Sequence, residues 1–191
     1  YQGRILRWHR HVLFLKPGII VMLDDLEAPV PSHFEWLLHS FEKMQINDNQ
    51  IIINRKTAAL SMSLFCPTGL TLSQTNQFDP PYNTGLEKSK HRALPNQWHL
   101  NAKTQQPCTK IRIAAVMVVT DKMETIDIEV KNIKGWLNIM SENHVGNIDV
   151  GVQLIAGTDS ANPLICNKSQ TLMYGKTDTD TVIIPDERTL Q

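Results

Sequence analysis

The chain has 191 residues, and its 19 lysines and arginines balance its 19 aspartates and glutamates. A formal net charge of zero without a polybasic block argues against a nucleic acid or an anionic membrane surface as the partner. The longest apolar run, residues 113–119, is far shorter than the ~20 residues that a membrane-spanning helix needs.

The overall pattern of the sequence is that of a β protein. Helical periodicity is scarce, whereas turn residues separate short apolar runs throughout the chain. We therefore predict an all-β fold, a large antiparallel β-sandwich of two stacked sheets. We expect one domain over residues 1–191, with residues 121–191 as a candidate for a small C-terminal sheet extension.

A β-hairpin is predicted close to the N-terminus. Residues 12–15 and 19–23 are rich in branched and aromatic side chains, and the Lys-Pro-Gly sequence between them has turn chemistry. If Lys16 and Ile19 flank the turn, directly opposed residues keep a constant index sum, and His11 then faces Asp24.

Alternation along the strand adds to this arrangement. It places His9 on the same face as His11 and points Arg10 the other way. The next predicted strand, residues 34–39, follows a loop with two prolines, and a meander would bring His39 back toward Asp24.

Two imidazoles and one carboxylate form a ligand set that suits zinc, with the fourth position left to water. An equal alternative is that His11 and Asp24 form a hydrogen-bonded pair at a sheet edge.

Residues 75–97 form a long polar excursion that contains Tyr82 and a basic cluster at residues 88–92. Loops of this length are usually functional or disordered. Its cations could reach over a cleft to bind carboxylates or sulfates. The alternative is a surface loop whose charges are simply solvated.

Trp98 and His99 open the next predicted strand, and residues 110–119 form the most apolar strand of the chain. Such a strand belongs at the centre of its sheet. The three cysteines are odd in number and lack a CxxC spacing, so they predict neither a disulfide framework nor a cysteine zinc site.

Residues 7–40, RWHRHVLFLKPGIIVMLDDLEAPVPSHFEWLLHS, resemble the β-sheet domain of heparinase II/III-like polysaccharide lyases. In that family an arginine, an apolar hairpin, an aspartate and a strand ending in Trp-Leu-Leu-His recur in this order. The resemblance continues loosely through residues 96–100 and rests on β-pattern alone after residue 121. It implies an N-terminal (α/α) toroid, a substrate cleft between the toroid and the sheets, and a chain that is the C-terminal part of a longer enzyme.

The resemblance also implies roles for individual residues. His9 would line the cleft as a catalytic residue, while His11, Asp24 and His39 would hold a structural zinc ion, with Asp25 as the alternative to Asp24. The candidate substrate-binding residues, taken from the resemblance and from the composition of the loop and strands, are Arg10, Tyr82, Trp98 and His99.

Lyases of this kind cleave uronic-acid polysaccharides by β-elimination, in which a base removes the proton α to the carboxylate and an acid assists the leaving oxygen. The tyrosine and asparagine that complete this chemistry lie largely in the toroid, so we expect the chain alone to be inactive. The implied partners are an acidic polysaccharide and the toroid, and the implied location is the bacterial periplasm or the outside of the cell.

Two other functions are compatible with the residues. One is a non-catalytic carbohydrate-binding sandwich in which tryptophans at positions 8, 36, 98 or 136 stack on sugar rings. The other is a purely structural sheet domain.

Overall fold

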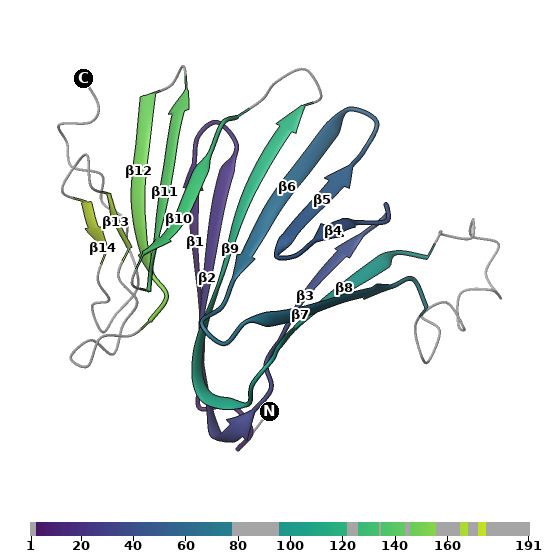
Figure 1. The fold of residues 1–191 in the computed structure, drawn as a ribbon, viewed down its shortest axis with the longest axis vertical. Helices are drawn as coiled ribbons and strands as arrows, with labels where there is room; N and C mark the ends of the chain where they lie inside the picture. Colours follow the sequence, from purple (N-terminus) through teal and green to yellow (C-terminus); the bar gives the residue numbers. More distant parts are fainter. Residues whose placement is uncertain are drawn as a thin grey trace.

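The computed structural model describes residues 3–77, 96–121, 126–133, 135–143, 146–155, 165–167 and 172–174. Within these ranges every regular element is a strand, and the strands form three antiparallel sheets (Figure 1). The predicted all-β fold is therefore confirmed. The described residues include no helix with the length and apolarity needed to cross a bilayer.

A six-stranded sheet forms the middle layer. Its order is β1 (Arg7–Leu15), β2 (Ile19–Ser32), β9 (Cys108–Asp121), β6 (Ala58–Phe65), β5 (Gln50–Asn54) and β4 (Gln45–Asn47). Residues 111–118 of β9 are all buried, because this strand lies between β2 and β6 and is covered on both faces. This position confirms the predicted central strand.

The two other sheets cover the two faces of the middle sheet. The five-stranded sheet has the order β10 (Glu129–Ile133), β11 (Trp136–Asn143), β12 (Gly146–Gln153), β13 (Ile165–Asn167) and β14 (Leu172–Tyr174). The three-stranded sheet has the order β3 (Glu35–Ser40), β8 (Trp98–Thr104) and β7 (Leu70–Thr75).

Two separate cores follow from this stacking. Alternate residues of β2 and β9 pack against the five-stranded sheet in a core that includes Ile19, Val21, Ala114, Leu137 and Val152. The intervening residues pack against the three-stranded sheet in a core that includes Met22, Ile113, Met62, Trp36 and Leu100. The prediction of stacked sheets is thus correct, and the structure adds a third layer to the two that were predicted.

The hairpin of β1 and β2 has a register that differs by one residue from the predicted one. Its loop has three residues, so that Leu15 pairs with Ile19 and His11 with Leu23. The Gly18 carbonyl in this loop accepts a 2.8 Å hydrogen bond from the amide of Val119 at the far end of β9. A Cβ atom at Gly18 would lie 2.3 Å from the Val119 carbonyl oxygen, which explains the glycine.

Candidate functional site

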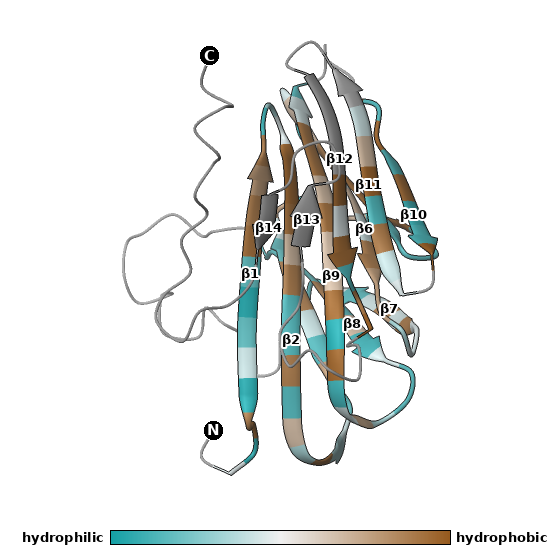
Figure 2. Cartoon of the chain, turned by 90° about the vertical axis from the view of Figure 1, so that its left-hand side faces the viewer, coloured by the Kyte–Doolittle hydropathy of each residue, from teal (hydrophilic) through white to brown (hydrophobic). Residues whose placement is uncertain are grey.

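One face of the β1–β2–β9 unit is apolar at one end and polar at the other. Figure 2 shows β1 changing from brown to teal along its length. On this face the apolar residues Leu13 and Leu15 pack against the core beneath the five-stranded sheet. The residues that precede them on the same side of β1 are Arg7, His9 and His11. The polar end of this face is the candidate functional site.

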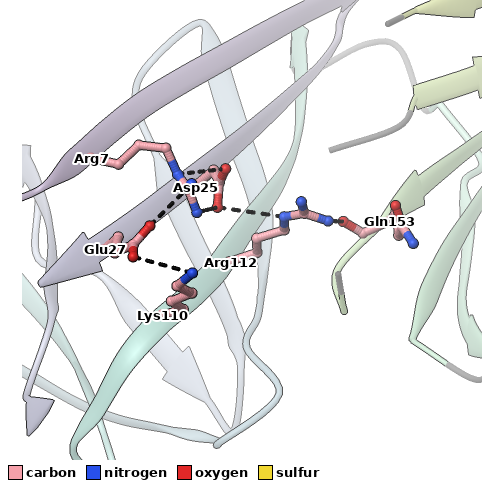
Figure 3. Close-up of polar contacts among 6 residues, drawn as sticks. All are labelled: Arg7, Asp25, Glu27, Lys110, Arg112 and Gln153. Atoms are coloured by element: carbon pink, nitrogen blue, oxygen red, sulfur yellow. Dashed lines mark hydrogen bonds and ion pairs between the residues drawn. The ribbon is translucent and has the colours of Figure 1, made fainter. Parts of the chain in front are cut away.

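Five charged side chains form a connected network there, which we call the charged cluster: Arg7, Asp25, Glu27, Lys110 and Arg112. The Arg7 Nε lies 3.0 Å from Asp25 Oδ2, and its Nη1 lies 3.1 Å from Glu27 Oε2 (Figure 3). Lys110 Nζ lies 3.2 Å from the other Glu27 oxygen, and Arg112 Nε lies 3.6 Å from Asp25 Oδ1. Three cations and two carboxylates give the cluster a net charge of +1.

The centre of the charged cluster is removed from water. Asp25 and Arg112 are each 3% exposed, and they are opposed in register on neighbouring strands. Buried charges are tolerated when they are paired, because each one alone would lose its hydration without compensation. The pairing of Asp25 with two arginines therefore holds β1, β2 and β9 together at this end.

His9 and His11 lie beside the charged cluster, on the face that alternation predicted for both. His9 is half-buried and directly opposite Asp25 in register. Burial lowers the pKa of the His11 imidazole, and the neighbouring charge of His9 lowers it further, whereas Asp25 raises it. His11 is therefore held mostly neutral at neutral pH.

Asp24 lies on the opposite face of β2, where it pairs with Arg10. Arg10 donates two hydrogen bonds to it, from Nε to Oδ1 at 2.7 Å and from Nη2 to Oδ2 at 2.8 Å. The hydrogen bond to Asp24 is also the main reason that the pKa of Arg10 is raised. The predicted pairing of His11 with Asp24 is wrong, because the three-residue turn shifts the register and turns Asp24 away from His11.

A groove runs beside the Arg10–Asp24 pair, between the middle sheet and β3. Its volume is about 450 Å³, and its lining includes Arg4, Trp8, Arg10, His33 and Glu35. Trp8 is 57% exposed, so much of this residue is accessible to solvent. Trp36, by contrast, is 5% exposed and belongs to the core.

His39 and His99 lie beside each other on the three-stranded sheet, whereas His11 lies on the middle sheet. They are opposed in register on β3 and β8, and their ring centroids are 4.5 Å apart. Burial lowers the pKa of His99, and the neighbouring His39 lowers it further. Trp98 packs at the edge of the core, with the Lys43 ammonium 5.2 Å from its ring centroid.

The residues predicted to hold zinc do not fit one site in this structure. Asp24 uses both carboxylate oxygens on Arg10, His11 lies on the other face, and His39 lies on another sheet. Asp25, the alternative, shares the face of His11 but is bound to Arg7 and Arg112. Across the described ranges no three His, Cys, Asp or Glu side chains are arranged to hold a metal ion. Zinc binding itself stays a prediction.

Two further points concern the predicted residues. Tyr82 and the basic residues 88–92 lie outside the described residues.

Sequence reasoning missed the role of Arg112, although a signal was present. Lys110 and Arg112 occupy alternate positions at the start of the most apolar strand, and therefore project from the same face of it.

No family model and no curated protein sequence matches the chain. Among solved structures, a heparinase III gene product matches with a TM-score of 0.52 and 11% identity, over 81% of this chain and 24% of its own. The heparan sulfate lyase HepC from Pedobacter heparinus matches with a TM-score of 0.51 and 13% identity, over 81% of this chain and 25% of its own. A mutant of HepC gives a TM-score of 0.51 at 12% identity, with the same coverage. The chain therefore has the fold of a segment that makes up about a quarter of these lyases.

Proposed function

We propose that the chain is the β-sheet domain of a polysaccharide lyase and that the face carrying His9 and the charged cluster completes its substrate cleft. Two findings point to the same family: the fold, shared with heparan sulfate lyases over 81% of this chain, and the sequence resemblance of residues 7–40. The observation that carries the proposal is the position of His9, half-buried beside the charged cluster of net charge +1.

This arrangement suits the demands of β-elimination on a uronic-acid polysaccharide. Negative charge develops on the substrate carboxylate as its α-proton is removed, and a fixed donor beside that carboxylate lowers the barrier. We assign the role of this donor to His9. The charged cluster attracts and orients acidic sugars, because guanidinium groups form strong paired hydrogen bonds with carboxylates and sulfates.

The groups that move protons are expected outside this chain, in an N-terminal toroid of the same protein. The chain alone would then be catalytically inactive. A periplasmic or secreted location in a bacterium belongs to the same proposal.

The test is lyase activity of the full-length protein on heparan sulfate, chondroitin sulfate and alginate, followed by the ultraviolet absorbance of the unsaturated product. We expect turnover on at least one of them, and about 100-fold or greater loss in His9→Ala. Val12→Ala is the control, because Val12 is exposed and points from the other face of β1. Absence of turnover on all three, or full activity of His9→Ala, would refute the proposal.

A second candidate function is favoured by the groove beside Arg10. An exposed indole next to a fixed Arg–Asp pair is suited to bind a sugar ring, with stacking on Trp8 and hydrogen bonds from Arg10. A carbohydrate-binding module without catalysis would bind oligosaccharides through this chain alone. Loss of that binding in Trp8→Ala, together with no lyase activity in the full-length protein, would favour this candidate.

A further inference from the structure

We propose that Arg112 is the anchor of an oxyanion site, which takes a sulfate or carboxylate group in a small cavity at the end of the five-stranded sheet. The contacts of Arg112 support the oxyanion site. The identification of a glycan as the source of the oxyanion rests on the proposed function.

Arg112 is a buried cation with long contacts only. It is 3% exposed, yet its Nε lies 3.6 Å from Asp25 Oδ1 and its Nη1 lies 3.5 Å from the Gln153 carbonyl oxygen. Charge-assisted hydrogen bonds of arginine normally measure about 2.7–2.9 Å. The buried Nε of Arg112, which points toward Asp25 in Figure 3, has no hydrogen-bond partner among the described residues. Arg112 thus retains donor capacity that the neighbouring described residues do not use.

The carboxylates nearby are already engaged by other cations. Arg7 contacts Asp25 at 3.0 and 3.3 Å and Glu27 at 3.1 Å, and Lys110 contacts Glu27 at 3.2 Å. Arg112 is therefore the cation of the cluster with the longest ion-pair contact, at 3.6 Å.

A cavity opens beside this guanidinium. Its volume is about 260 Å³, and its polar lining consists of Arg7, Asp25, Thr68, Lys110 and Arg112. The remaining walls are Pro67, Ile111, Leu154 and Ile155. At about 30 Å³ for each water molecule, the space is large enough for several waters or for one tetrahedral or planar oxyanion.

The charges of the side chains that line the cavity indicate which class of ligand it would bind. Most of the accessible lining is apolar, and its charged part consists of three cations and the one carboxylate Asp25, so among ions an anion is favoured over a cation. A guanidinium binds planar carboxylates and sulfate oxygens through two donors at once. The cavity would therefore hold an oxyanion.

The distance to His9 suits a substrate contact. His9, Asp25 and Arg112 form a row across three neighbouring strands. Two strand spacings amount to about 10 Å, which is comparable to the length of a disaccharide. A glycan that places one uronate at His9 would present an acidic group of a neighbouring sugar to Arg112, which would make Arg112 a residue that determines specificity.

The first measurement is sulfate binding by this chain, titrated calorimetrically at constant ionic strength with chloride as the balancing anion. We expect saturable binding of about one sulfate, weakened about ten-fold or more in Arg112→Gln because a charged hydrogen-bond donor is lost. Arg55→Gln is the matched control, since Arg55 contacts the Phe41 ring outside the charged cluster. If Arg112→Gln does not fold, Lys110→Gln serves instead, because Lys110 is 65% exposed and its loss should weaken binding several-fold.

The second arm replaces sulfate with a heparan sulfate tetrasaccharide. Tighter binding of the tetrasaccharide that falls in Arg112→Gln identifies a glycan as the source of the oxyanion, whereas free sulfate binding alone supports the site with a free anion as its ligand. No saturable binding of either ligand by the folded wild-type chain would mean that water fills the cavity, and would overturn the proposal. Sulfate binding without lyase activity in the full-length protein would refute the proposed function and leave the oxyanion site standing.

Discussion

The adjacent residues Asp25 and Asp24 provide a direct test of the electrostatic account, because they lie on opposite faces of β2. Asp25→Ala would leave Arg112, which is 3% exposed, without its carboxylate. An uncompensated buried charge of this kind costs about 3–5 kcal/mol. Asp24→Ala removes two hydrogen bonds from Arg10, but the Arg10 side chain is 42% exposed and can regain water. After discounting for solvent screening, we expect a cost of about 1–2 kcal/mol.

Urea unfolding of the two variants and the wild type would measure both costs, with an unchanged dependence on urea as the check on two-state behaviour. The double variant Asp25→Ala/Arg112→Met should recover much of the loss, because it removes the stranded charge as well. The reasoning would be refuted by equal destabilisation in Asp24→Ala and Asp25→Ala, or by a double variant less stable than Asp25→Ala.

Two further predictions concern the histidines. Because burial lowers the pKa of His11 in the folded state, protonation favours the unfolded chain, so its contribution to stability is complete above about pH 6.5 and declines as the pH falls below that value. Unfolding free energies at pH 7 and pH 5 should therefore differ less in His11→Gln than in the wild type, and an equal difference would contradict this assignment. For zinc, mass spectrometry of the purified chain should find the same metal content in the wild type and in His39→Ala, because His39 lies on a different sheet from His11 and Asp24. Stoichiometric zinc that is lost in His39→Ala would show that the zinc set implied by the resemblance does form.

The layered architecture was partly predictable from the sequence. Alternating apolar residues indicate strands, and the continuous apolar run in residues 113–119 correctly indicated a strand at the centre of its sheet. The number of layers was not predictable, because it depends on which strands pair across long sequence separations. The pairing of β3 with β8, for instance, joins segments about sixty residues apart and creates the third sheet.

The β1–β2 hairpin shows how a difference of one residue in loop length changes which side chains lie opposite each other. Lys16, Pro17 and Gly18 allow a loop of two or three residues, and in the structure all three belong to the loop, while Gly18 is also hydrogen-bonded to Val119 on a distant strand. A shift by one residue moves the partner of His11 from Asp24 to Leu23. The shared face of His9 and His11 survives this shift because it depends on alternation within one strand.

The charged cluster was harder to foresee. Its central contact joins Asp25 on β2 to Arg112 on β9, and only the tertiary register brings them together. The local pattern does show that Lys110 and Arg112 share a face, which marks the polar end of an otherwise apolar strand. Their carboxylate partners could not be chosen from the sequence alone.

The most direct test of the proposed cleft compares His9→Ala with Arg10→Ala in the full-length protein, by kcat/KM on the best uronic-acid polysaccharide. These neighbours project from opposite faces of β1, so the comparison identifies the face that meets the reacting sugar. The account predicts a loss of about 100-fold or more for His9→Ala and less than about ten-fold for Arg10→Ala. The reverse order would place the cleft on the side of Trp8 and Arg10, and would contradict the account.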